Sequence, residues 1–143
     1  MSTPAKKLVD VGIAIVFNAA HSHVLVCRRK HDTVLAGYYE FPGGKCDHGE
    51  TPECCAIREV REEVALVVRA LRELPAIEHE YPYAHVRLHP FVCEHVSGDL
   101  QLLAVADAQW VEPQHVLSYQ FPEANDALVH AVSRGFAALL TTN

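Results

Sequence analysis

The segment from Gly44 to Leu66 constrains this chain most strongly, because it joins a glycine-rich bend to a short acidic helix. The bend is Gly43-Gly44-Lys45. The pair Thr51-Pro52 that follows is typical of a helix start, since threonine can cap free amides and proline is tolerated in the first turn. We therefore predict a helix over about 52–64.

One side of this helix carries three carboxylates, from Glu59, Glu62 and Glu63. Residues three or four apart project from the same side of a helix, so these acids form one stripe, and the apolar residues form another. Alone, the pattern also fits the solvated face of an amphipathic helix. The glycine bend and Glu50, which a surface helix does not require, favour a site for a metal ion and phosphate.

Carboxylate oxygens favour hard divalent cations, and magnesium in proteins commonly shares its ligands with substrate phosphates. We therefore predict Mg²⁺ as the cofactor, with Mn²⁺ able to replace it. Such an ion neutralises charge on the attacking and leaving oxygens when water cleaves a diphosphate.

The spacing of these residues resembles a known signature. Gly44 is followed after five residues by Glu50, after seven more by Arg58-Glu59, and then by Glu62-Glu63. This resembles the Nudix box of hydrolases that cleave nucleoside diphosphates linked to another group. The resemblance implies an α/β fold, the Nudix-type α/β/α sandwich with a mixed β-sheet between helices.

The resemblance also implies roles for individual residues. The metal ligands would be the carbonyl of Gly44 and the carboxylates of Glu59, Glu62 and Glu63. Glu59 would also act as the base that takes a proton from water. Arg58 would orient Glu59, and Glu50 would have a supporting role near the metals.

Two basic residues, Lys45 and Arg29, are candidates for contacts with phosphate. Lys45 occupies the position of a lysine that contacts a phosphate or leaving group in relatives, although it also fits an exposed loop lysine. Arg29 follows a short apolar strand, where relatives place a phosphate-contacting arginine. Arg28 would point to the opposite face of that strand, and we interpret it as a surface charge.

Other segments resemble the MutT branch, whose members hydrolyse 8-oxo-dGTP to its monophosphate and pyrophosphate. These segments are Tyr39-Glu40-Phe41-Pro42-Gly43-Gly44-Lys45, Gly49-Glu50-Thr51-Pro52 and Phe121-Pro122-Glu123-Ala124-Asn125. The resemblance implies that Asn125 hydrogen-bonds the oxidised purine; the alternative is a helix-start residue that bonds the local backbone. Phe41 is either a wall of the base pocket or a core residue, and Tyr81 and His85 are further candidate walls.

Two positions depart from the family pattern. Ala65 replaces the glycine that ends the helix; if this position is left-handed, alanine strains it by roughly 1 to 2 kcal/mol. Ala104 stands where relatives often have another metal-contacting glutamate. We hypothesise that Asp107 or a water molecule takes its place.

Length and composition restrict the remaining choices. A chain of 143 residues fits one domain, which we expect to cover 1–143. The net charge of −6 argues against polymeric nucleic acid as a partner, but a small nucleotide remains compatible with local positive charge. Five cysteines without a C-x-x-C pair predict reduced, mostly packed thiols. No segment approaches about 18 uninterrupted apolar residues, and Met1 to Lys7 lacks the apolar stretch and cleavage site of a secretory signal, so we expect no membrane partner and a cytoplasmic location.

Valine- and isoleucine-rich segments predict a hairpin over Leu8 to Phe17 and Val24 to Arg28. We expect further strands at about 66–74, 76–81, 85–96, 100–103 and 108–111. Apolar residues at helical spacing from Glu123 onward predict a helix that ends the chain.

Two rival functions remain. One is a Nudix hydrolase of broad specificity, or one specific for CTP or dCTP derivatives. The other is a non-catalytic module that senses nucleotides or DNA lesions. The presence of every box acid and of Arg58 counts against the second.

Overall fold

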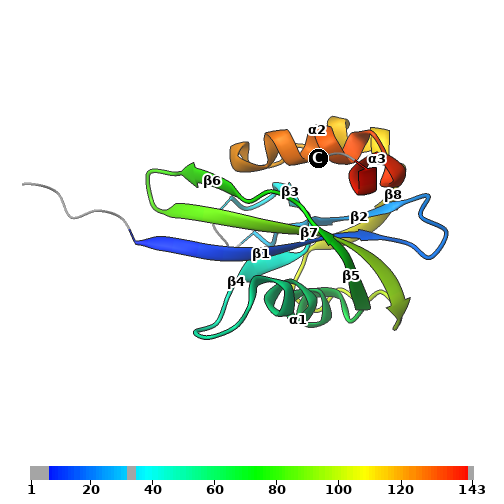
Figure 1. Ribbon diagram of the computed structural model, residues 1–143, viewed down its shortest axis with the longest axis horizontal. Coiled ribbons are helices and arrows are strands. Elements are labelled where there is room, and N and C mark those ends of the chain that lie inside the picture. Colours follow the sequence, from blue (N-terminus) through cyan, green and yellow to red (C-terminus); the bar gives the residue numbers. More distant parts are fainter. Residues whose placement is uncertain (1–6, 32–34, 142–143) are drawn as a thin grey trace, which may run out of the picture.

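The computed structural model of the protein describes residues 7–31 and 35–141 (Figure 1). The prediction that no secretory leader precedes the domain rests mainly on residues 1–6, which lie outside the described residues.

Eight strands of the described residues form one mixed sheet. They are β1 (Leu8–Phe17), β2 (Val24–Arg28), β3 (Tyr39–Glu40), β4 (Gly43–Lys45), β5 (Val67–Glu73), β6 (Ile77–Glu80), β7 (His85–Ser97) and β8 (Asp107–Val111). The main path runs β3-β2-β1-β7-β5, while β4 pairs with β1, β6 with β7 and β8 with β2. Only β1 and β7 run parallel among these pairs; the others are antiparallel.

Helices cover both faces of this sheet (Figure 1). Helix α1 (Pro52–Val64) lies on one face, and α2 (Asp126–Ser133) and α3 (Phe136–Thr141) lie on the other. Side chains alternate along β1, so that Ile13 and Ile15 enter the core below α2 while Ala14 and Val16 enter the core against α1. The predicted α/β/α sandwich with a mixed sheet is therefore confirmed.

Helix α1 begins and ends where the sequence predicts. The hydroxyl of Thr51 accepts a hydrogen bond of 3.2 Å from the amide of Cys54, which caps the first turn. Ala65 ends the helix in the left-handed region, with φ 65°. This conformation favours glycine, so the predicted strain at Ala65 is present.

Strands predicted at 66–74, 76–81, 85–96 and 108–111 are confirmed as β5 to β8, and the hairpin of β1 and β2 is also present. The strand predicted at 100–103 is wrong. The backbone amides of Gln101 and Leu103 bond to the carbonyls of Val64 and Glu63 instead. This segment therefore closes the end of α1 and does not extend the sheet.

The loop between β2 and α1 contains two short strands, β3 and β4, that the sequence did not predict. The helix predicted from Glu123 onward is broken. A short 3₁₀ turn (Glu123–Asn125) precedes α2, and Gly135, with φ 97°, separates α2 from α3. A second 3₁₀ segment, Pro113–Ser118, follows β8.

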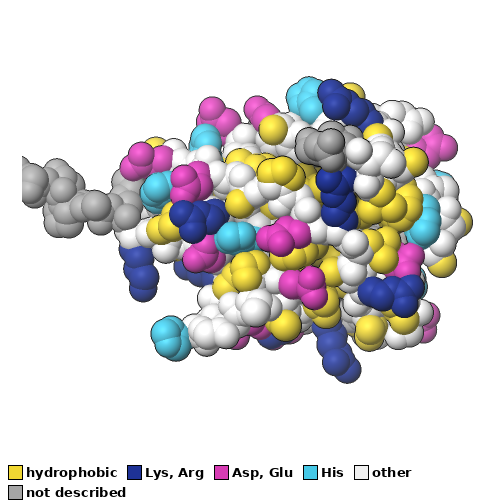
Figure 2. Space-filling model, in the orientation of Figure 1, with side chains coloured by type: hydrophobic (Ala, Val, Ile, Leu, Met, Phe, Trp, Pro, Cys, Tyr) yellow, Lys and Arg dark blue, Asp and Glu magenta, His cyan; other side chains and the backbone are white. Residues whose placement is uncertain are grey.

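Acidic, basic and apolar side chains are interspersed on the face shown in Figure 2. No helix among the described residues is long and apolar enough to cross a membrane. All five cysteines are free thiols, and Cys27, Cys55 and Cys93 are buried, as predicted for packed thiols.

Candidate active site

The glycine bend packs directly against α1. A Cβ atom added at Gly44 would lie 2.5 Å from Cδ of Glu59, so only glycine allows this carboxylate to approach the bend. One strand away, a Cβ atom at Gly12 would lie 2.7 Å from the carbonyl of Pro52. The two glycines therefore allow the first half of α1 to lie close against β1 and β4.

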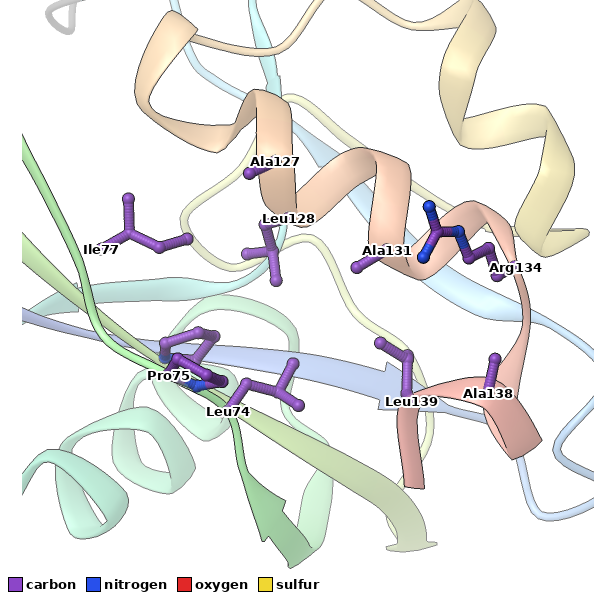
Figure 3. A pocket seen from close by; sticks show the side chains of 10 residues that line it. Leu74, Pro75, Ile77, Ala127, Leu128, Ala131, Arg134, Ala138 and Leu139 are labelled. Carbon is purple, nitrogen blue, oxygen red and sulfur yellow. The ribbon is translucent and has the colours of Figure 1, made fainter. Parts of the chain in front are cut away.

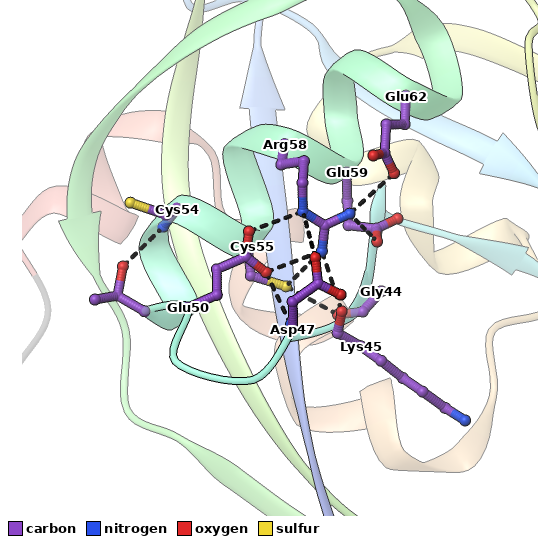
Figure 4. Close-up of polar contacts among 10 residues, drawn as sticks. Gly44, Lys45, Asp47, Glu50, Cys54, Cys55, Arg58, Glu59 and Glu62 are labelled. Carbon is purple, nitrogen blue, oxygen red and sulfur yellow. Dashed lines mark hydrogen bonds and ion pairs between the residues drawn. The ribbon is translucent and has the colours of Figure 1, made fainter.

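Arg58 is the centre of the polar network on α1 (Figure 4). Its guanidinium donates two hydrogen bonds to Glu50, of 2.8 and 2.9 Å, and one each of 2.9 Å to Glu59 and Glu62. It also donates to the carbonyl of Lys45 at 3.2 Å. The hydrogen bonds from Arg58, together with the amide of Asp47, lower the pKa of Glu50 to about 2. Arg58 therefore fixes the orientation of Glu59, and Glu50 fixes Arg58.

Glu63 is the only charged or polar side chain among the buried residues of the described chain, with 7% of its surface exposed. Its Oε1 atom is buried and has no hydrogen-bond partner. Burial, and then the neighbouring carboxylates Glu59 and Glu40, raise the pKa of Glu63 well above the ordinary range, while the amide of Gly43 acts in the opposite direction. A buried oxygen without a partner is costly unless a ligand satisfies it.

The three acids of the stripe do not all face the same space. Glu59 and Glu63 line a small cavity together with Arg29, Lys30, Glu40, Gly43 and Ala104. Glu62 is not among these residues; its carboxylate is largely exposed and bonds to Arg58. The carbonyl of Gly44 accepts a hydrogen bond of 3.2 Å from the thiol of Cys55. We call the space lined by Glu40, Glu59 and Glu63 the acid cavity.

In the described part of the chain, no group of three or more His, Cys, Asp or Glu side chains is placed so that it could hold a metal ion as the side chains stand. The guanidinium of Arg58 bonds to both Glu59 and Glu62, and this is one reason why these two carboxylates do not meet at a common metal position. The donor set nevertheless suits a hard cation, because the acid cavity offers carboxylate oxygens and the free Oε1 of Glu63. The residues present therefore fit a divalent ion.

A second hollow lies beside the acid cavity and contains the predicted nucleotide-binding residues. Arg29, Phe41, Lys45, Tyr81 and Asn125 all line it, and we call it the nucleotide pocket. His85, predicted as another wall, does not line it. His85 is the first residue of β7, where it pairs with Leu8 of β1 and Glu80 of β6.

Phe41 is a core residue that also lines this pocket. It is 3% exposed and packs on Phe121 with ring centroids 4.9 Å apart. Asn125 lies at the start of α2, but its side chain makes no capping hydrogen bond. The alternative in which Asn125 bonds the local backbone as a helix cap is thus wrong.

The basic candidates occupy different positions. Arg29 donates a hydrogen bond of 2.6 Å to Glu40 and lines both the nucleotide pocket and the acid cavity. The Lys45 side chain is exposed and extends away from the Arg58 network (Figure 4). Arg28 is partly exposed, and its Nε is buried without a hydrogen-bond partner, so it is not a fully solvated surface charge.

Glu40 is the acid that sequence reasoning missed. It follows Tyr39 in the segment already noted before Gly43, but the two-residue strand that aims it at the acid cavity has no periodic signal. Asp107, the hypothesised substitute at the Ala104 position, does not line this cavity. It pairs with Arg28 across β2 and β8 and accepts a hydrogen bond from Gln109.

A further, apolar cavity lies between α2, α3 and the sheet (Figure 3). Leu74, Ile77, Leu128 and Leu139 are among its walls, and Arg134 is the only charged side chain among the described residues that line it. None of its described lining residues is an acid, and it shares no lining residue with the acid cavity.

Comparison with known proteins identifies the class of this enzyme. Residues 6–132 match the model of the NUDIX domain, and the chain belongs to this family. It is a Nudix hydrolase, and the rival reading of a non-catalytic module is not supported.

Its relatives include an 8-oxo-dGTP diphosphatase and a CTP pyrophosphohydrolase. The chain is 28% identical to the 8-oxo-dGTP diphosphatase of Escherichia coli over 90% of this chain and 98% of that protein. It is 26% identical to the CTP pyrophosphohydrolase of E. coli over 87% of this chain and 91% of that protein. A crystal structure of the MutT protein from Methanosarcina mazei has the same fold, with a TM-score of 0.80 and 21% identity, covering 92% of this chain and 97% of that one.

Proposed function

We propose that this Nudix hydrolase uses a divalent ion, Mg²⁺ or Mn²⁺, to hydrolyse 8-oxo-dGTP to 8-oxo-dGMP and pyrophosphate. The observation that carries the metal-dependent chemistry is the buried Oε1 of Glu63, which has no partner and lies with Glu59 at the acid cavity. The relative named 8-oxo-dGTP diphosphatase and the nucleotide pocket beside this cavity support the choice of substrate.

Glu59, Glu62, Glu63 and the carbonyl of Gly44 are the proposed ligands. A bound divalent ion would neutralise the charge of the phosphates and make the phosphorus a better electrophile. Glu59 and Glu63 already lie at one cavity. Glu62 must turn from Arg58, and the Gly44 carbonyl must exchange the Cys55 thiol for the ion.

The remaining residues of the box organise this chemistry. Glu59 is the proposed general base, since it lies against the glycine bend and its carboxylate is oriented by Arg58. Glu50 accepts two hydrogen bonds from Arg58 and so supports Glu59 indirectly. Arg29 and Lys45 are the proposed phosphate contacts, because both line the nucleotide pocket.

The base is the group that this pocket must recognise. Phe41 offers an apolar surface, and Asn125 offers an amide that is not used as a helix cap. An amide carries both donors and an acceptor, so it can match a purine edge that presents both. We propose that Asn125 reads the oxidised purine and that Phe41 packs against it.

A pyrimidine substrate is the second candidate, and the similarity to a CTP pyrophosphohydrolase favours it. The comparison of 8-oxo-dGTP, dGTP, CTP and dCTP with Mg²⁺ separates the two by pyrophosphate release. We expect kcat/KM to be highest for 8-oxo-dGTP and Asn125→Ala to reduce that preference. Faster turnover of CTP or dCTP than of 8-oxo-dGTP would replace our substrate with the pyrimidine nucleotide.

A further inference from the structure

Glu40 brings a carboxylate into the acid cavity that the Nudix box does not include. Its side chain lies on β3, on the sheet side of the cavity, whereas Glu59 and Glu63 come from α1. Carboxylates from two different elements therefore face the space in which the free Oε1 of Glu63 is buried.

Ala104, the position that departs from the family pattern, also lines this cavity. The amide of Ala104 bonds to the carbonyl of Glu63 at 3.2 Å, so this wall is held next to the acids. A glutamate at position 104 would add a carboxylate to the same cavity. The alanine at this position supplies no carboxylate, and Asp107 does not line the cavity.

The charges around Glu40 show that it shares an environment with the proposed ligands. Burial raises the pKa of Glu40, Arg29 counteracts this rise, and the Glu59 carboxylate adds to it. Glu40 in turn contributes to the raised pKa of Glu63. Three acid groups thus share one cavity, and a divalent cation bound there would favour their charged forms.

The ion pair of Arg29 with Glu40 lies where two spaces meet. Both residues, together with Gly43, line the nucleotide pocket and the acid cavity. A polyphosphate that extends from the pocket toward the acids must pass Arg29. Phosphate oxygens compete with the Glu40 carboxylate for the same guanidinium, because both are good bidentate partners of arginine.

We propose that Glu40 is a metal-contacting carboxylate that compensates for the acid missing at Ala104, and that Arg29 holds it until a substrate phosphate takes over the guanidinium. This inference rests on the proposed function, since it requires a divalent ion at the acid cavity. It adds a ligand from β3 and a coupling between phosphate binding and metal binding.

Titration with Mn²⁺, followed by the paramagnetic resonance signal of the free ion, tests this role without relying on activity. We expect Arg29→Gln to bind Mn²⁺ more tightly than the wild type, because Glu40 is released and a positive charge is removed. Adding Glu40→Gln to Arg29→Gln should then weaken Mn²⁺ binding about tenfold. This pair of variants excludes the trivial effect of leaving Arg29 unpaired.

Two further variants make the experiment specific. Adding Ala104→Glu to Glu40→Gln should restore the lost Mn²⁺ affinity. Such a rescue would show that the Glu40→Gln protein is folded. Asp107→Asn should leave the affinity unchanged. If Arg29→Gln binds Mn²⁺ equally well with and without Glu40→Gln, the role of Glu40 is overturned. In that case, loss of Mn²⁺ binding in Glu63→Gln would leave the proposed function intact. If the wild type does not bind Mn²⁺, both the proposed function and the role of Glu40 are contradicted.

Discussion

At the scale of single residues, Arg58 determines how the acids of the box are arranged. One guanidinium holds Glu50, Glu59 and Glu62 and the carbonyl of Lys45. Five donors in a planar fork allow this, whereas a lysine ammonium has three donors at one point. The identity of Arg58 as arginine, and not only its charge, should therefore matter for turnover.

We expect Arg58→Lys to lower kcat about 10- to 100-fold, because Glu59 loses its fixed orientation. Arg61→Lys, an exposed position on the same helix, is the matched control and should retain full activity. Steady-state kinetics with Mg²⁺ measure both variants. Equal kcat for wild type and Arg58→Lys would show that orientation by the guanidinium is not needed.

At the scale of elements, α1 was predictable and the loop before it was not. Thr51, Pro52 and the apolar spacing are local signals, and they give the bounds of α1 without knowledge of the rest of the fold. The two-residue strand at Glu40 depends on pairing with Cys27, which is distant in sequence. The box acids were therefore identified from sequence, whereas Glu40 and the separation of Glu62 from the acid cavity required the structure.

Ala65 offers a test of how α1 ends. Its left-handed conformation costs alanine about 1 to 2 kcal/mol, and the greater freedom of glycine in the unfolded chain offsets part of this. We expect Ala65→Gly to raise the free energy of unfolding by about 0.5 to 1 kcal/mol.

Urea denaturation measures this change. Ala127→Gly, at an exposed position within α2, is the control and should destabilise the protein by about 1 kcal/mol. Destabilisation by both substitutions would mean that the backbone at position 65 is not under strain.

At the scale of the whole molecule, ion pairs join segments far apart in the sequence. Glu94 on β7 contacts His21 in the β1–β2 turn at 2.8 Å and Arg69 on β5. Arg69 first, and then His21, lower the pKa of Glu94 in the folded protein. Glu94 therefore adds stability above the unfolded pKa of about 4.3, and this is lost as the pH falls through the lower folded value.

We expect Glu94→Gln to lower the urea midpoint at pH 7 and to differ less from the wild type at about pH 3, where the wild-type carboxylate is becoming protonated. Glu73→Gln, an exposed acid on β5, should have little effect at either pH. A difference between Glu94→Gln and the wild type that stays constant across this range would argue against the ion pairs.

The most direct test of the account is Mg²⁺-dependent pyrophosphate release from 8-oxo-dGTP by the wild type and Glu59→Gln. The account predicts that chelation of divalent ions stops the wild-type reaction and that Glu59→Gln lowers kcat by about 10² to 10⁴. Turnover that persists without divalent ions, or that is unchanged in Glu59→Gln, would contradict it.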